Sequence, residues 1–168
     1  MSLEDVLGPD LRVVIAGTIA AWHRAEQEHY YAGPGNSFWL LLHESGLTPE
    51  LLSPAEEHRL PDHGIGLTDL VRTERSEPGE PPHFDVPGFH RTLHDAAAPA
   101  VAFVSKTAAS SYARATGRRL PRDYGELPWT VDGIPAFVLP GPSGANNGMP
   151  LPLRIALWRD LTDFLATL

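Results

Sequence analysis

Short runs of apolar residues, separated by more polar stretches, predict four buried strands in this chain. The runs cover residues 11–16, 65–71, 100–104 and 134–139. Continuous apolar runs of this length are typical of parallel strands that are buried on both faces. Gly17 follows the first run directly, so we expect the chain to leave the sheet at that residue.

Between and after these runs, apolar side chains recur at the spacing of helices. The pattern predicts helices at residues 37–45, 49–59, 88–98, 107–116 and 153–168. Gly46 and Gly117 supply stop signals for two of them. Proline, glycine and charged residues predict loops at 73–87, 118–132 and 140–152.

Strands that alternate with helices predict an α/β fold. We expect a three-layer αβα arrangement around a central, mostly parallel four-stranded sheet, formed by one domain that covers residues 1–168. Ligands of such sheets bind beyond the carboxyl ends of the strands. The loops that follow Ala16, Val71, Val104 and Leu139 are therefore the first places to look for a site.

The charge and the composition narrow the function classes. The chain has 13 Lys and Arg against 21 Asp and Glu, a formal charge of −8, which argues against nonspecific binding of polyanions. Cysteine is absent, which excludes disulfides, cysteine-bound zinc and a thiol nucleophile. No apolar run reaches the length of a membrane span, and no export signal is evident. We expect a soluble, cytoplasmic monomer.

The segment between the first strand and the first helix is the most informative for chemistry. Residues 17–39 combine many aromatic, histidine and glycine residues, and long ordered loops are often functional. The segment contains neither a P-loop nor a dinucleotide-binding fingerprint, so no cofactor is expected. His23 and His29 lack the spacing of a metal pair on a helix, so we expect no metal site. They remain candidates for an acid, a base or a phosphate contact, or for solvated residues.

Three segments carry a resemblance to a known family. They are His29-Tyr-Tyr-Ala-Gly-Pro-Gly-Asn-Ser-Phe-Trp39 with its continuation Leu42-His-Glu-Ser-Gly-Leu-Thr48, then His63-Gly-Ile-Gly-Leu-Thr-Asp-Leu-Val71, then Val138-Leu-Pro-Gly-Pro-Ser-Gly144. In order and spacing the chain resembles the uracil-DNA glycosylase superfamily, and within it the mismatch-specific uracil/thymine-DNA glycosylase branch. The resemblance implies the αβα fold and the removal of a damaged base from DNA.

The chain departs from that branch at the residue that matters most. There the first strand is followed by Gly-Ile-Asn-Pro-Gly, whose asparagine positions the attacking water, and the ungapped register puts Ile19 in its place. Isoleucine cannot orient water. Gly141 stands where the family usually has a polar side chain. Either the activity is lost or another residue has taken over the task.

Asn36 is the candidate for that task. The chain resembles the hypoxanthine-DNA glycosylase branch here, because that branch also lacks the first asparagine and has one in a segment similar to Tyr-Tyr-Ala-His-Pro-Arg-Asn-x-Phe-Trp. Asn36 matches that position. The structural alternative is that Asn36 only caps the helix that begins at Ser37.

The resemblance also implies contacts to a base that has been flipped out of the DNA. Tyr31 aligns with the aromatic residue that stacks on the base, and such stacking contributes about 1–3 kcal/mol. Asp69 occupies the place from which the family faces the base, and Gly17 belongs to the same base-binding set. Backbone N–H groups of Thr18 or Ile19, and of Tyr31, would stabilise the departing base. The structural alternatives are a core aromatic for Tyr31 and a helix cap or surface ion pair for Asp69.

Two further features concern contact with DNA. By resemblance, one loop enters the minor groove and fills the gap left by the flipped nucleotide, although an ordinary strand-to-helix turn would explain the same residues. This loop is Pro142, Ser143, Gly144, Ala145 and Asn146. Arg118, Arg119 and Arg122 are candidates for phosphate contacts or for solvated side chains.

The leading hypothesis is therefore a monofunctional DNA glycosylase that hydrolytically excises uracil, and also hypoxanthine or related deaminated bases, and leaves an abasic site for base excision repair. The expected partner is damaged DNA, single- or double-stranded. An alternative from another class is a relative that binds damaged DNA without cutting it, because Ile19 replaces the usual asparagine. A hydrolase of small nucleotides ranks last, since it rests on fold analogy alone.

Overall fold

The computed structural model describes residues 4–19, 29–33, 35–73, 83–143 and 148–168. Its sheet has six strands in the order β3-β2-β1-β4-β6-β5. The four central strands are parallel, as predicted. They are β1 (Val13–Ile19), β2 (Ile65–Thr73), β4 (Val101–Val104) and β6 (Ala136–Leu139).

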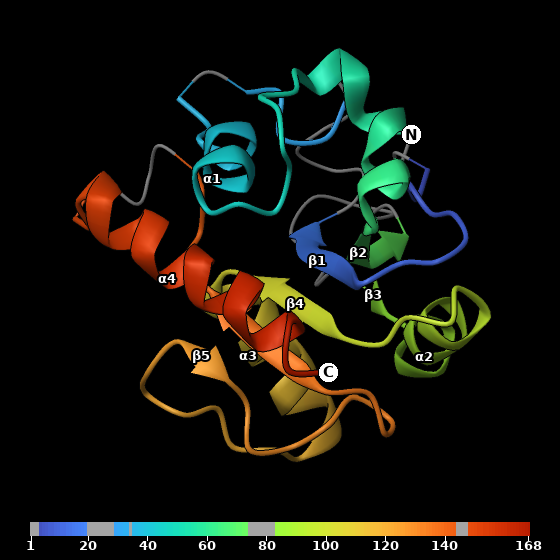
Figure 1. Ribbon diagram of the computed structural model, residues 1–168. Helices are drawn as coiled ribbons and strands as arrows, with labels where there is room; N and C mark the ends of the chain where they lie inside the picture. Colours follow the sequence, from blue (N-terminus) through green and yellow to red (C-terminus); the bar gives the residue numbers. More distant parts are fainter. Residues whose placement is uncertain (1–3, 20–28, 34, 74–82, 144–147) are drawn as a thin grey trace.

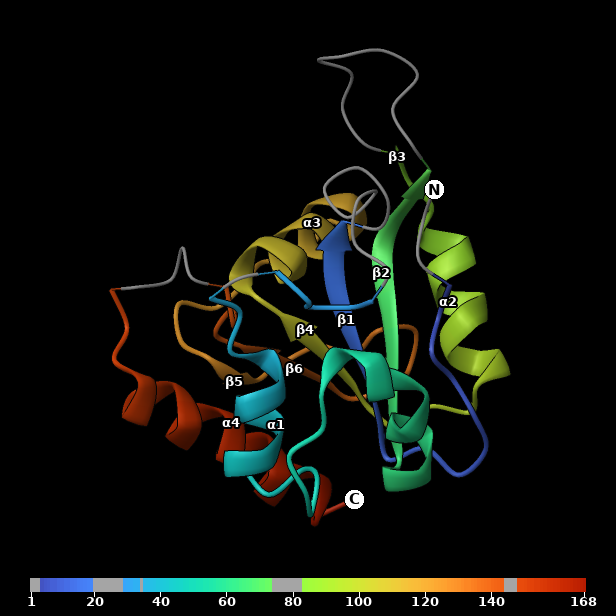
Figure 2. The same ribbon diagram turned by 90° about the horizontal axis from the view of Figure 1, so that it is seen from above.

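Helices cover both faces of the sheet, which gives the predicted three layers (Figures 1 and 2). One buried cluster joins the sheet to α1 (Phe38–Glu44), α4 (Leu151–Leu165) and the 3₁₀ helix η1 (Pro54–His63). A second cluster joins the other face to α2 (Val86–Asp95) and α3 (Lys106–Thr116). In the described segments, no helix is long and apolar enough to cross a membrane.

The first strand is longer than its sequence pattern predicts. β1 continues past Gly17 to Ile19, because Gly17 pairs with Asp69 and Ile19 pairs with Val71 on the long strand β2. The expectation that the chain leaves the sheet at Gly17 was therefore wrong. Asp69, expected near the end of its strand, lies in the middle of β2.

Short antiparallel strands occupy two of the predicted loops. β3 (His83–Phe84) pairs with the end of β2, and β5 (Gly125–Glu126) pairs with β6. Strands of two residues show no periodicity in the sequence, so the pattern could not reveal them. They extend the four-stranded parallel sheet at its two edges.

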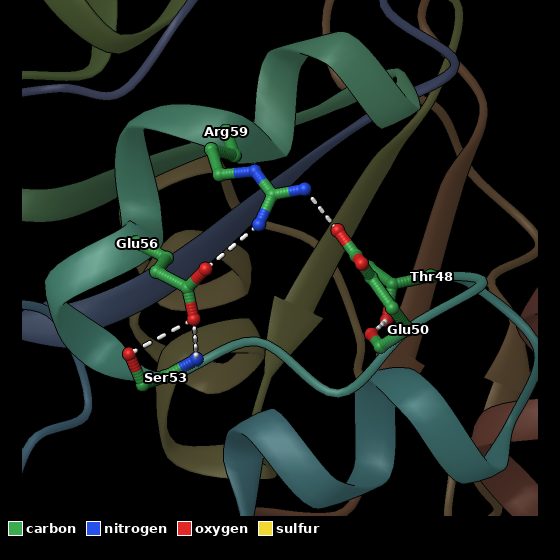
Figure 3. Close-up of polar contacts among 5 residues, drawn as sticks. All are labelled: Thr48, Glu50, Ser53, Glu56 and Arg59. Carbon is green, nitrogen blue, oxygen red and sulfur yellow. Dashed lines mark hydrogen bonds and ion pairs between the residues drawn. The ribbon is translucent and has the colours of Figure 1, made fainter.

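The second predicted helix is a 3₁₀ helix that starts later than expected, at Pro54. Proline at the first position suits a helix start, whereas Pro61 inside the helix has no N–H to donate, which disfavours a regular α-helix. The start is held by the Glu56 carboxylate, which accepts hydrogen bonds from the Ser53 backbone N–H and hydroxyl at 3.0 and 3.1 Å (Figure 3). Arg59 joins Glu56 to Glu50. These contacts lower the pKa of Glu56, chiefly through the backbone hydrogen bond from Ser53.

Candidate functional site

The strand order reverses between β1 and β4, and the carboxyl ends of these two strands lie side by side. β1 lies between β2 and β4, and the chain leaves β1 toward β2 before it crosses to the other side to form β4. Doubly wound sheets bind ligands at such a reversal of strand order. The groups at these strand ends are therefore the first to compare with the predicted site.

The backbone of β1 presents one predicted donor toward β4. The N–H of Val14 donates to the Ala100 carbonyl, toward β4, at 3.0 Å. Because successive N–H groups of a strand point to opposite sides, the N–H of Thr18 also faces the β4 side, whereas that of Ile19 faces β2. Of the two predicted donors on β1, Thr18 is thus on the β4 side, where the strand order reverses. The Ile19 backbone belongs to the ladder with β2.

Ser105 and Gly141 meet where β4 and β6 end. Ser105 follows β4 directly and has φ 125° and ψ 168°, a conformation that is almost confined to glycine. A Cβ atom on Gly141 would lie 3.3 Å from the Ser105 Cβ, so the absence of a side chain at 141 lets the two segments approach. Strain of this kind clusters at functional sites. No sequence signal marks Ser105, because its backbone conformation depends on its neighbours.

Asp69 is buried at the opposite side of β1. Only 1% of its surface is exposed, so the alternative of a surface ion pair or helix cap is wrong. Side chains alternate along β2, and Ile65 and Leu67 belong to the cluster under α1 and α4. The Asp69 side chain therefore points to that same face, beside its pairing partner Gly17.

Tyr31 packs on the face to which Asp69 points. Its ring stacks on Phe38 with centroids 3.9 Å apart and planes 17° apart, and Phe38 is fully buried. Tyr31 itself is half-buried and has φ 52°, a left-handed conformation that is uncommon for an aromatic residue. The core-aromatic alternative thus holds for one ring face, while the partial exposure leaves surface for a ligand.

A carboxylate on η1 holds the backbone that precedes Tyr31. Glu57 accepts a hydrogen bond from the Tyr30 N–H at 2.8 Å and lies 3.1 Å from Nδ1 of His29. Tyr30 is fully buried, as expected for a structural residue, and its carbonyl accepts from Nε1 of Trp39 at 3.3 Å. His29 is therefore not simply solvated. The sequence did not predict this role of Glu57, because a carboxylate in a short polar helix gives no local sign of a hydrogen-bond partner 27 residues away.

Asn36 lies where the first and last segments of the resemblance meet. Its Oδ1 accepts a hydrogen bond from the Phe38 N–H at 3.0 Å, so it caps α1 as the structural alternative expects. The next N–H, that of Ser37, donates to the Pro142 carbonyl at 2.8 Å. The Asn36 side chain is half-buried. A carbonyl oxygen has two lone pairs, so this cap leaves acceptor capacity for a water molecule.

The loop after β6 is described only in part. Pro142 is buried, and Ser143 is exposed, while Gly144, Ala145 and Asn146 lie outside the described residues. Trp158 donates from Nε1 to the Pro140 carbonyl at 3.0 Å, which fixes the start of the loop against α4. Ser143 is thus the described residue of this loop that is available to a partner.

In the described parts of the chain, no group of three or more His, Cys, Asp or Glu side chains could hold a metal ion. Arg118, Arg119 and Arg122 are exposed. Lys106, at the start of α3, donates to the Arg122 carbonyl, so this arginine lies on the strand-end edge. His23 lies outside the described residues.

The strand order and the helices on both faces of the sheet (Figure 2) define a doubly wound α/β protein. A family model described as the uracil DNA glycosylase superfamily matches residues 4–162. The chain belongs to this superfamily. The match covers nearly all of the chain, so it includes every segment described above.

A solved structure supports the same fold. It is the solution NMR structure of a protein from Methanosarcina acetivorans described as a "putative Uracil DNA glycosylase". The two chains share 20% identity with a TM-score of 0.64, and the similarity covers 98% of this chain and 97% of that chain. At this identity the similarity concerns the fold.

Proposed function

We propose that this protein is a monofunctional DNA glycosylase that removes uracil, and also hypoxanthine, from DNA by hydrolysis. One observation carries the proposal: a buried carboxylate, Asp69, and a half-buried aromatic ring, Tyr31, share one face of the sheet. A flipped base needs both a stacking surface and a polar partner for its edge. Membership of the superfamily supports the same chemistry.

In the proposed reaction, the base enters between Tyr31 and the strand ends. An oxygen of Asp69 accepts the N3–H of uracil or the N1–H of hypoxanthine, which are both lactam donors. The N–H of Thr18 donates to the base as negative charge develops on it. The Thr18 contact stabilises the leaving group, and the Asp69 contact recognises the base.

The bond between C1′ of the sugar and the base nitrogen breaks, and the electron pair leaves with the base. The sugar becomes oxocarbenium-like, and a water molecule held by Asn36 attacks C1′. One proton of that water is lost to solvent and the base takes up a proton, so that the products are a free base and an abasic site. Orientation of water requires a positioned acceptor more than a strong base.

A second candidate is binding of damaged DNA without excision. It is favoured by the Asn36 Oδ1 contact to the Phe38 N–H, because a side chain engaged as a cap is less free to hold water. Under this hypothesis the pocket would retain the flipped base.

Single-turnover incubation with oligonucleotides that contain uracil, hypoxanthine or xanthine, followed by alkali, separates the two candidates. We expect strand cleavage at uracil in single- or double-stranded DNA. Tight retention of the oligonucleotide with every base intact would instead support binding alone. If the protein neither cleaved nor retained an oligonucleotide with any of the three bases, both candidate functions would be contradicted.

A further inference from the structure

Arg154 is a buried cation on the helix that follows the proposed DNA-contacting loop. Only 9% of its surface is exposed. Its Nε and Nη1 atoms are buried and have no hydrogen-bond acceptor among the described residues. A buried charge without a partner costs several kcal/mol or more, so proteins seldom retain one unless it has a ligand.

The position of Arg154 follows from the packing of α4. Arg154, Trp158, Leu161 and Leu165 form the buried side of this helix. The Trp158 ring lies 5.7 Å from that of Phe38, at the start of α1. Further along α4, Thr162 donates to the Ser45 carbonyl at 2.9 Å, at the end of α1. The two helices therefore run in the same direction.

Arg154 lies one turn closer than Trp158 to the start of α4. Side chains of a helix lean toward its N-terminus, so the guanidinium extends beyond the Trp158 ring toward the level at which α1 begins. There the N–H of Ser37 meets the carbonyl of Pro142. The cation is thus placed beside the segment that holds Asn36.

The start of α4 adds a second feature that favours an anion. Its N-cap position, Pro150, supplies no side-chain hydrogen bond, and no acidic residue lies in the first turn. The N-terminus of a helix carries a partial positive charge. In α4 the N–H groups of Leu153 and Arg154 donate to the Pro150 carbonyl and Pro152 has no N–H, so this helix start contributes its dipole. A helix start and an unpaired buried guanidinium therefore act together on the same side of the site.

We propose that Arg154 and the start of α4 bind a phosphodiester of the DNA strand whose base is flipped. The inference rests on the proposed function and identifies a contact between the protein and the sugar-phosphate backbone of the DNA. A protein with a formal charge of −8 cannot rely on a general positive surface to hold DNA. A single buried cation at the site would supply a local, well-oriented contact, since arginine matches phosphate geometry.

Salt dependence tests this contact directly. Binding of uracil-free single-stranded DNA would be measured at several salt concentrations for the wild type, Arg154→Met and Arg154→Lys. Each phosphate contact contributes about 0.7 to the slope of log affinity against log salt for single strands. We expect Arg154→Met to lower the slope by about that amount, to weaken binding several-fold at low salt and to raise the melting temperature, because it removes an unpaired buried charge. Arg154→Lys should retain most of the slope.

The matched control is Arg159→Met, which removes the same charge from the same helix but at a residue that is exposed and donates to the Glu44 carbonyl. It should leave the slope unchanged. An unchanged slope in a folded Arg154→Met variant would overturn the inference. A second result would also overturn it. If inorganic phosphate at constant ionic strength raised the melting temperature of the wild type but not of Arg154→Met, while the salt slope for DNA was the same in both, the ligand would be a small anion. The readout needs no excision, so a wild type that binds DNA but releases no base would refute only the proposed function.

Discussion

The two faces of the sheet are built on different principles. Under α2 and α3, aromatic rings fill the core and their polar atoms are bonded at its rim: the Tyr112 hydroxyl lies 2.8 Å from Nε2 of His90, and Trp129 Nε1 donates to the Arg119 carbonyl at 2.9 Å. Under α1 and α4, the core instead contains a carboxylate, Asp69, and a guanidinium, Arg154. Buried charge is costly, so its concentration on one face indicates where the ligand binds.

The face under α2 and α3 shows what a purely structural polar group looks like here. Burial raises the pKa of Tyr112, Arg118 opposes this shift, and Asp132 adds to it. We therefore expect changes on this face to alter stability, and changes on the other face to alter excision.

The Asn36→Ala variant should show the largest loss. Without the carboxamide, water is no longer held beneath the sugar, and misplacement of a reacting group costs about 100-fold or more. Single-turnover excision from a uracil oligonucleotide measures the effect. Asn36→Asp serves as the control. Aspartate also caps helices, so this variant keeps the cap but lacks the carboxamide, and it separates loss of the cap from loss of catalysis. A rate for Asn36→Ala near that of the wild type would assign the residue to capping alone.

Asp69→Ala should reduce kcat/KM for uracil by about 10–100-fold, because the lactam N–H of the bound base would be left without an acceptor. Asp69→Asn retains a carbonyl oxygen of the same shape and should lose much less. Steady-state kinetics on uracil and hypoxanthine oligonucleotides would compare the two variants. Equal losses in both would argue against an acceptor role for this side chain.

Glu57→Ala should lower excision by about 10-fold or less. The Tyr30 N–H and the His29 ring would lose their partner, and Tyr31 would be held less firmly. The loss should appear in KM more than in kcat, since stacking on the base contributes to binding. The neighbouring Glu56→Gln variant alters the same helix without touching Tyr30, so it should leave KM unchanged.

Phe103→Ala should leave excision by the folded protein unchanged while it lowers stability. Phe103 is fully buried on the face under α2 and α3, and loss of such a ring costs about 3–5 kcal/mol. Urea unfolding and the rate per folded molecule measure the two effects. A large loss of rate at full folding would remove the distinction between the faces.

The acid dependence of η1 gives the smallest effect. The pKa of Glu56 is lowered in the folded protein, so its contribution to stability is present above the unfolded pKa and is lost as the pH falls through the folded value. The difference in melting temperature between the wild type and Glu56→Gln should therefore shrink between pH 7 and pH 3. A difference that grows on acidification would contradict the direction of this shift.

The fold could be predicted because its central strands are rich in apolar and β-branched residues, and this signal is local. The end of β1 could not, since Gly17 and Thr18 belong to the strand only through their pairing with β2. For the site, the resemblance pointed to Tyr31 and Asn36 in its first segment and to Asp69 in its second. The role of Glu57 depends on distant contacts.

Arg154 and Ser105 differ in whether the sequence could have revealed them. The spacing of Arg154 with Trp158 and Leu161 on the apolar side of the last helix was a visible signal, since a lone cation on such a stripe is unusual. Ser105 had no such signal, because a glycine-like backbone on a serine results from the packing of two strand ends.

The central claim is that the face under α1 and α4 releases a base from DNA. Its most direct test is quantification of free uracil from an oligonucleotide with one labelled uracil, with enzyme in excess. We predict one equivalent of free uracil from the wild type, and a bound oligonucleotide with its base still attached from Asn36→Ala. Stable binding by the wild type with no release of uracil would contradict the claim.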